Sequence, residues 1–234
     1  MNRADAAVEV EIAAGARLRL LAGRAAFDPA RAVLFVADAH IGKAATFRAL
    51  GVPVPEAATA DTLVRLAQLI QATGARHLVF LGDLLHAARG RTPATLRSLD
   101  IWRQHHAPIA MTLVRGNHDA AAGDPPAALG IAVVDGPLRL GPWALVHEPQ
   151  SVAGAYALAG HVHPCVVLDG RAKDRLRLPS FHFGPDCGVL PAFGAFTGMH
   201  ALPRRARDRI WAVAAGRVVP ITPMATIAPP TLAA

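Results

Sequence analysis

The sequence predicts an α/β fold in which two mixed β-sheets pack together with helices outside them. Apolar runs rich in β-branched and aromatic residues lie at residues 33–37, 78–81 and 111–114, and each is typical of a buried strand. Helical patterns separate these runs, at residues 56–73 and 92–105. After residue 130 the pattern changes to short strands with glycine and proline turns. Strand–helix units followed by a mostly β region predict two layers of sheet with helices outside.

Local patterns place the first elements in order along the chain. Residues 8–12 and 17–21 flank Gly15 and predict a β-hairpin. The helical pattern at residues 56–73 places four apolar side chains on one face: Leu63, Leu66, Leu69 and Ile70. Thr92-Pro93 predicts the start of a second helix, which runs to about His105, because proline suits the first turn.

Length and composition predict one cytoplasmic domain with no membrane partner. Residues 1–224 of the 234 fit a single large domain, and residues 225–234 are expected to form a loose tail. No apolar run reaches the roughly 20 residues that a membrane span needs, and the first residues lack a signal peptide's apolar stretch. Cys165 and Cys187 are the only cysteines, which favours reduced thiols over a disulfide framework.

Five short polar motifs follow apolar runs, where strands would end and where an α/β fold collects its site. They lie at residues 38–40, 82–83, 116–119, 146–147 and 160–163. A single such histidine or aspartate is more often a surface or turn residue. Five in succession predict a metal site that combines carboxylate, amide and imidazole ligands. The candidate metal ligands are Asp38, His40, Asp83, Asn117, His147, His161 and His163.

Spacing suggests how two of these motifs present their side chains. Alternate residues of an extended chain point to the same face. If the strand at residues 33–37 continues, Asp38 and His40 therefore reach the same metal. His161 and His163 repeat this spacing after the apolar run at residues 156–159.

Several neighbouring polar residues allow two interpretations each. Asp119 either orients a neighbouring imidazole or caps the segment that follows it. His86, three residues after Asp83, either approaches the site from a turn or lies apart from it. His77, His105 and His106 are interpreted as surface or hydrogen-bonded residues.

These motifs resemble those of a known superfamily. The pattern D-x-H, GD, GNH[D/E], H and GHxH is similar to that of the calcineurin-like metallophosphoesterases over residues 33–168. The segments ADAHIGKAATFRALGVPVP, LGDLLHA and LPAFGAFTG resemble the narrower ligase-associated DNA damage response endonuclease (PdeM) family over nearly the whole chain. That family usually reads FTGG, whereas Met199 and His200 follow Gly198 here. The resemblance implies a four-layer α/β/β/α sandwich.

The resemblance also implies two divalent metal ions that share Asp83. One metal would be held by Asp38, His40, Asp83 and His163, and the other by Asp83, Asn117, His147 and His161. A hydroxide bridging such a pair attacks phosphorus in line. His118, paired with Asp119 as the candidate catalytic residues, would assist the leaving group. Oxygen and imidazole donors without thiolate suit Mn²⁺, with Fe or Zn²⁺ as alternatives.

Charge points to an anionic substrate without identifying it. The chain has 24 Lys and Arg against 17 Asp and Glu, which attracts polyanions, although an arginine-rich genome gives the same balance. Four cations follow the metal-binding strands and either contact phosphates or are simply solvated: Lys43, Arg48, Arg89 and Arg91. Aromatic residues make up only 5% of the chain, so we expect DNA recognition through the backbone.

Three functions therefore compete. The leading one is a Mn²⁺-dependent DNA endonuclease that acts on single-stranded or unpaired DNA in repair, in association with a ligase and a helicase. The second is a phosphoesterase acting on a small nucleotide or cyclic nucleotide. The third is a binding module that has lost catalysis, which the complete ligand set and His118 disfavour. Only the family resemblance of LPAFGAFTG favours the first over the second.

Overall fold

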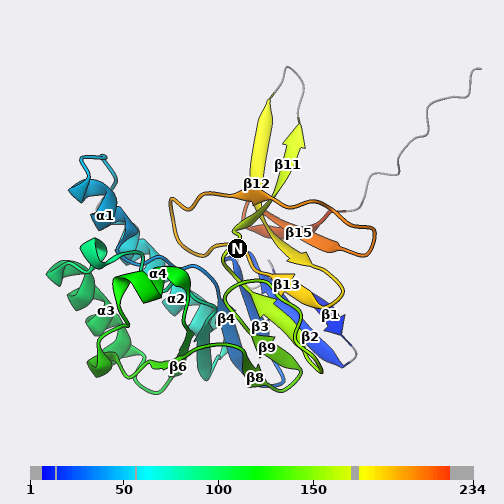
Figure 1. Cartoon of the computed structure of the whole chain (residues 1–234), viewed down its shortest axis with the longest axis horizontal. Coiled ribbons are helices and arrows are strands. Elements are labelled where there is room, and N and C mark those ends of the chain that lie inside the picture. The colour runs from blue at the N-terminus through cyan, green and yellow to red at the C-terminus, as the bar shows by residue number, and fades with distance from the viewer. Residues whose placement is uncertain (1–6, 14, 56, 170–173, 222–234) are drawn as a thin grey trace, which may run out of the picture.

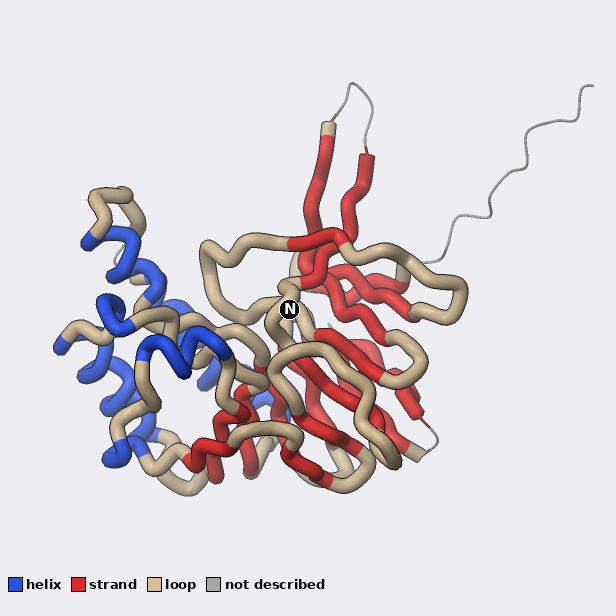
Figure 2. Tube along the Cα trace, viewed as in Figure 1, coloured by secondary structure: helices blue, strands red, loops and turns tan. Residues whose placement is uncertain are grey.

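Two β-sheets stack face to face, and the helices gather on the outer side of the first sheet (Figures 1 and 2). The computed structural model describes residues 7–13, 15–55, 57–169 and 174–221. The α/β class with two mixed sheets is therefore confirmed. The expected tail at residues 225–234 lies outside the described residues.

The first sheet places four parallel strands beside an antiparallel region. In spatial order its strands are β1 (Ala7–Ala13), β2 (Ala16–Leu21), β3 (Ala25–Asp28), β4 (Val33–Val36), β5 (His77–Phe80), β6 (Ala110–Val114) and β7 (Ala132–Val134). Strands β1 to β4 pair antiparallel, and β4 to β7 pair parallel. The hairpin turns at Gly15, whose φ of 72° suits glycine, as predicted.

Helices connect the parallel strands. They are α1 (Lys43–Ala49), α2 (Ala58–Thr73), α3 (Pro93–His105) and α4 (Asn117–Ala122), with short 3-10 turns η2 (Ala88–Gly90) and η3 (Ala127–Leu129). The α3 bounds match the prediction, and the Thr92 hydroxyl accepts a hydrogen bond from the Thr95 N–H at 3.2 Å. The predicted first residue of α2, at position 56, lies outside the described residues.

The second sheet is also mixed. In spatial order its strands are β14 (His200–Ala201), β11 (Pro164–Asp169), β12 (Arg175–Phe183), β13 (Cys187–Val189), β10 (Tyr156–Ala159), β9 (Trp143–Leu145) and β8 (Leu138–Leu140). Strand β15 (Arg209–Ala214) pairs with β12 and with β16 (Arg217–Pro220). The ends of β11 and β12 project beyond the sandwich (Figure 1).

Successive side chains of the central strands point to opposite faces of the first sheet, and they form one hydrophobic core on each face. On β4, Leu34 packs toward the helices with Leu66 of α2, whereas Phe35 packs between the sheets with Trp143. Both cores bury their large side chains almost entirely, and close packing of this kind restricts the strands that they hold. The functional motifs begin where these strands stop.

The helices are distributed more unevenly than the resemblance implies. All α-helices of the described residues lie between Lys43 and Ala122, and they cover only the first sheet. On the second sheet, Val146, Ala157 and Ala159 form a small separate cluster with Val152 and Cys187. The expected outer helical layer on the second sheet is therefore not found in the part of the chain that the structure describes. None of the described helices is long and apolar enough to cross a membrane.

Candidate metal centre

The five polar motifs meet at one edge of the sandwich. The parallel strands β4, β5 and β6 end together, so their motifs at residues 38–40, 82–83 and 116–119 become neighbours. The parallel strands β9 and β10 of the second sheet bring the motifs at residues 147 and 161–163 to the same place. The seven candidate ligands therefore lie close to one another at this edge.

Asp83 stands at the middle of this cluster. Its side chain is buried, and its two carboxylate oxygens face different groups of residues. Oδ2 lies 3.8 Å from Nε2 of His40, and Oδ1 lies 3.4 Å from Nε2 of His147. Such a carboxylate can serve two neighbouring cations at once.

The first group surrounds His40. Its Nε2 lies 3.3 Å from Nε2 of His163, which in turn lies 3.8 Å from Oδ1 of Asp38. Burial, together with the nearby Lys43 and His163, lowers the pKa of His40 to about 2. A neutral imidazole with a free lone pair is the form that binds a metal.

The second group surrounds His147. Its Nε2 lies 2.9 Å from Oδ1 of Asn117 and 3.1 Å from Nδ1 of His161, and these last two atoms are 3.1 Å apart. Two ligands at right angles on a metal with bonds of about 2.1 Å are about 3.0 Å apart. The spacing of these three donors therefore fits a shared cation.

Hydrogen bonds to backbone carbonyls determine which nitrogen of His147 and His163 is available to bind a metal. Nδ1 of His147 lies 3.0 Å from the carbonyl oxygen of Leu81, and Nδ1 of His163 lies 3.0 Å from that of Gly198. A carbonyl can only accept, so each Nδ1 carries the proton and each Nε2 keeps its lone pair. Both lone pairs then face the carboxylates.

The buried charge also fits a metal. Asp38 and Asp83 are buried, yet among the described residues neither forms a salt bridge with lysine or arginine. Each carboxylate accepts a hydrogen bond from the backbone. The N–H of His161 donates to Asp38 and the N–H of His118 donates to Asp83, both at 3.0 Å. Burial raises the pKa of Asp83, and His147 opposes that rise. Two buried carboxylates need positive partners, and divalent cations supply them.

The backbone at these ligands is left-handed, and the extended-chain prediction is wrong. The φ angles of Asp38, His40, His161 and His163 are 53°, 46°, 68° and 52°. The spacing of two residues therefore does not present side chains as a strand would. The chain instead folds back at each ligand, which costs about 1–3 kcal/mol per residue and is common at functional sites.

The glycines of the motifs make room for the ligands. A Cβ atom on Gly82 would collide with the imidazole of His147, and Gly82 also has a φ of 83°. A Cβ atom on Gly116 would collide with the carboxylate of Asp83. The GD and GNH motifs thus need glycine because the backbone and a candidate metal ligand occupy adjacent space.

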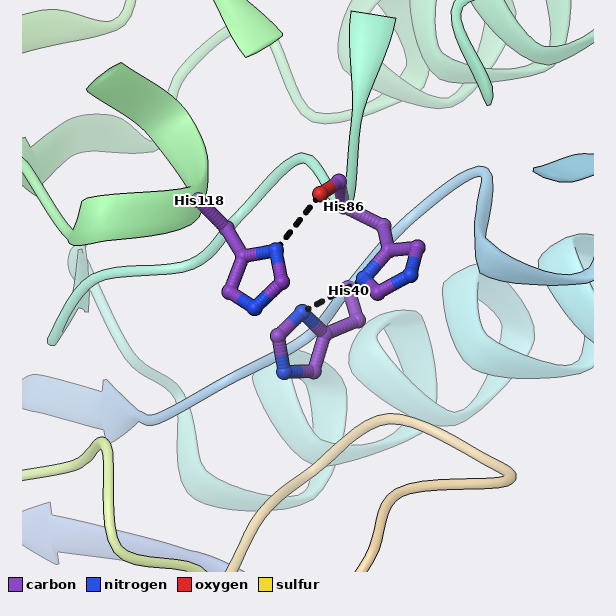
Figure 3. Close-up of side chains that lie close together, drawn as sticks. All are labelled: His40, His86 and His118. Carbon is purple, nitrogen blue, oxygen red and sulfur yellow. Dashed lines mark hydrogen bonds between the residues drawn. The ribbon is translucent and has the colours of Figure 1, made fainter. Parts of the chain in front are cut away.

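The structure places His86 beside His40 and His118 (Figure 3). Its Nδ1 lies 3.3 Å from Nδ1 of His40, and its ring stacks on that of His118 with centroids 4.8 Å apart. Burial, together with the nearby Lys43, lowers the pKa of His86 to about 4. Nδ1 of His118 donates to the backbone carbonyl of His86 at 2.7 Å, which leaves Nε2 of His118 free.

Asp119 caps a helix in this structure. Its carboxylate accepts hydrogen bonds from the N–H groups of Gly116 at 3.0 Å and Leu85 at 2.9 Å. These contacts fix the start of α4, which carries Asn117 and His118, to the loop after β5. Asp119 thus lies within α4 and caps the start of its own helix, and not the start of a segment that follows it.

The four candidate phosphate contacts differ in availability. Lys43 is partly buried beside the centre, where burial lowers its pKa and Asp83 and Asp38 oppose that change. Arg89 is exposed and forms no salt bridge among the described residues. Arg48 is exposed, and its Nη1 donates to Val54 and Pro55 at 3.5 and 3.4 Å. Arg91 uses its Nη1 to bind the carbonyls of Ala122, Gly123 and Asp124, so it supports the end of α4.

The segment at residues 192–198 contributes more than its sequence indicated. The N–H groups of Phe193 and Gly194 donate to the carbonyls of Ala37 and Asp38, at 2.8 and 2.9 Å. The carbonyl of Gly198 accepts from His163. Only the resemblance of LPAFGAFTG signalled this segment, because no local pattern places it beside β4.

Comparison with known families settles the class of the protein. Residues 32–162 match the calcineurin-like phosphoesterase family. The chain belongs to the calcineurin-like phosphoesterase family. Together with the clusters of histidine and aspartate able to bind metal, this membership makes the protein a metal-dependent phosphoesterase.

Solved structures give a second comparison. The Pseudomonas putida nuclease MPE is 45% identical, with a TM-score of 0.81, over 92% of this chain and 100% of that one. This likeness agrees with the narrower resemblance seen in the sequence. The E. coli phosphoesterase Yfce matches at 17% identity and a TM-score of 0.39, over 76% of this chain and 86% of that one. A search of curated proteins gave no match.

Proposed function

We propose that this phosphoesterase is a Mn²⁺-dependent DNA endonuclease that cuts single-stranded or unpaired DNA during repair. The observation that carries the proposal is the joint occurrence of a two-group metal centre and 45% identity to a nuclease over 92% of the chain. Association with a DNA ligase and a helicase follows from the family resemblance in the sequence, and it belongs to the same proposal.

The two donor groups provide the proposed metal sites. Asp38, His40, Asp83 and His163 would hold one cation, and Asp83, Asn117, His147 and His161 the other. When bound, two such cations would supply phosphate binding and a water molecule of lowered pKa as the nucleophile. Mn²⁺ suits the mixture of oxygen and imidazole donors, with Fe or Zn²⁺ as alternatives.

His118 is proposed as the residue that protonates the leaving oxygen. Its Nδ1 is committed to the carbonyl of His86, so Nε2 is the atom that holds or releases the proton. Its ring lies 4.8 Å from that of His40, which places it against the first donor group. Stacking on His86 restricts the ring to this orientation (Figure 3). Asp119 contributes by holding the start of α4 and therefore the backbone of His118.

Nicking of a circular single strand tests the proposal. We expect Mn²⁺-dependent cleavage of circular single-stranded DNA, slower cleavage of relaxed duplex, and no cleavage with EDTA. Replacing Lys43 and Arg48 together should weaken DNA cleavage and spare a small activated phosphodiester, since the small substrate needs only the metal centre. Equal losses on both substrates would remove these two residues as DNA contacts.

The alternative substrate class is decided by the same assay. If no form of DNA is cut but a nucleotide or cyclic nucleotide diester is hydrolysed, the protein is a small-molecule phosphoesterase. If neither substrate is hydrolysed with Mn²⁺, Fe²⁺ or Zn²⁺, the fold serves binding and the proposed chemistry is wrong.

A further inference from the structure

Phe196 is an aromatic ring in an unusual position. Half of its surface is exposed, and it is the one aromatic residue among the large hydrophobic side chains that are exposed in the described chain. Its φ of 58° is left-handed, which is costly for a bulky residue. Half of the ring is therefore available for a contact in solution.

The loop that presents Phe196 is fixed at both ends to the metal centre. On one side, Gly194 donates to the carbonyl of Asp38 at 2.9 Å. On the other side, Gly198 accepts from His163 at 3.0 Å. Thr197 closes the loop by donating its hydroxyl to the carbonyl of Gly194 at 3.3 Å. Phe196 is therefore held in place relative to two candidate metal ligands.

The ring borders a hollow that opens beside the first donor group. Phe196 and Ala195 form one wall, and His40 and Lys43 form part of the other. An apolar ring, a cation and a metal ligand thus surround one space. At about 10 Å³ the hollow is too small for a base, so a stacked base would lie against the exposed half of the Phe196 ring, with Lys43 close enough to the same place to attract its phosphate.

Charge favours this side of the centre for the strand. A second hollow lies beside Asn117 and His147, but Asp135 and Glu148 line it, and its Arg115 is paired with Asp124 and Asp135. The hollow near Phe196 is lined by Lys43 and, among the described residues, by no carboxylate. Asp135 is compensated by Arg115, but Glu148 forms no salt bridge among the described residues, so a phosphate chain should be repelled there and should run past Lys43 instead.

We propose that Phe196 is a stacking platform for the base of an unpaired nucleotide next to the scissile phosphate. The inference rests on the proposed nuclease function and adds a source of preference for single strands. A paired base is covered by its neighbours in the duplex and cannot lie against the ring. Stacking tolerates any base, because every base has an aromatic face, so it predicts no strong sequence preference.

Binding measurements test the platform directly. The Mn²⁺-loaded His118→Ala protein, which cuts slowly, is titrated with a labelled single-stranded oligonucleotide and followed by fluorescence anisotropy. Adding Phe196→Ala should weaken binding by about 5- to 150-fold, the range for loss of one stacked base. Phe196→Trp should retain the affinity. Ile101→Ala, which removes an equally exposed apolar side chain from α3, should change nothing.

Abasic nucleotides identify the stacked base. A single abasic residue is moved along the oligonucleotide in steps relative to the mapped cleavage position. One position should weaken binding to the protein with Phe196 but not to the Phe196→Ala protein. If abasic penalties are the same in both proteins at every position, or if Phe196→Ala binds normally, the platform is refuted.

Two controls separate the possible failures. Metal content and thermal unfolding of Phe196→Ala should match the parent, and a loss of metal would mean that Phe196 only supports the loop, which overturns the inference. If the parent protein neither binds nor cuts any single-stranded DNA, the proposed nuclease function fails instead. If the parent protein cuts single-stranded DNA normally but Phe196→Ala changes neither binding nor the abasic penalties, only the stacking platform is rejected and the nuclease function stands.

Discussion

At the scale of single residues, the metal centre depends on conformations that side-chain type does not reveal. Asp38, His40, Asp83, His161 and His163 all have positive φ. Their identities and their positions after strands were predictable from the sequence, because carboxylates and imidazoles at strand ends indicate a site. Their left-handed backbone was not, since it results from contacts such as that of Asp38 with the N–H of His161.

His118 should be separable from the metal ligands. We expect His118→Ala to keep two bound metals and to lose about 10²- to 10⁴-fold in the rate of DNA cleavage, as for a positioned acid. The loss should be smaller with a nitrophenolate leaving group, which needs no proton. Metal analysis and kinetics with both substrates test this. A fall in metal content that parallels the rate would make His118 a ligand or a structural residue.

Gly82 should be intolerant of a side chain for a local reason. Gly82→Ala places a methyl group against His147, so we expect loss of metal from the group around His147 and loss of activity. Gly154→Ala is the matched control, because Gly154 has a φ of 74° with open space around it. Both variants bear the cost of positive φ, about 1 kcal/mol. Similar metal content in the two variants would contradict the steric explanation.

At the scale of elements, the site is assembled from the ends of strands and from loops far apart in sequence. The bridge between Ala37 and Ala192 brings the loop at residues 192–198 beside β4. Arg65 of α2 secures the same loop, since its guanidinium lies 4.0 Å from the ring centroid of Phe193 and donates to the Phe193 carbonyl. No hydrophobic periodicity in the sequence predicts such long-range contacts. By contrast, α3 was predictable because Thr92 and Pro93 mark its start locally.

Arg91 should behave as a structural residue of α4 and Lys43 as a substrate contact. Arg91→Ala removes hydrogen bonds to three carbonyls at the end of α4. We expect it to lower the free energy of unfolding by about 1.5–3 kcal/mol, and to leave the salt dependence of DNA binding unchanged. Lys43→Ala should reduce the steepness of that salt dependence by about one phosphate contact. Urea unfolding and DNA titrations at several salt concentrations compare the two. A reduced salt dependence in Arg91→Ala would return it to the set of DNA contacts.

At the scale of the whole molecule, one basic sandwich presents its metal centre at a single edge. The formal net charge of +7 already counts the two buried carboxylates of the candidate centre as negative. Bound divalent metal would neutralise them and make the net charge of the protein more positive still. The two-sheet architecture was predictable from apolar runs and their order. The restriction of the helices to one face was not predictable, because the sequence of the short strands after residue 130 does not indicate what covers the outer side of their sheet.

Salt should inhibit DNA cleavage more than hydrolysis of a small diester. Each phosphate contact releases counterions, so the logarithm of the affinity for a single strand falls by about 0.7 per contact for each tenfold increase in salt. A small activated diester has too little charge to show this. Initial rates at limiting substrate between low and physiological salt provide the comparison. Equal inhibition of both substrates would indicate an effect on the metal centre.

The central claim is a two-metal centre that shares Asp83, and the metal content of Asp83→Ala tests it most directly. The wild-type chain should bind two Mn²⁺ ions. Asp83→Ala should lose affinity at both positions and lose phosphodiesterase activity, because each cation loses a ligand at once. Metal stoichiometry by mass spectrometry and hydrolysis of an activated diester are measured on the same preparations. Two tightly bound ions or near wild-type turnover in the variant would contradict the account.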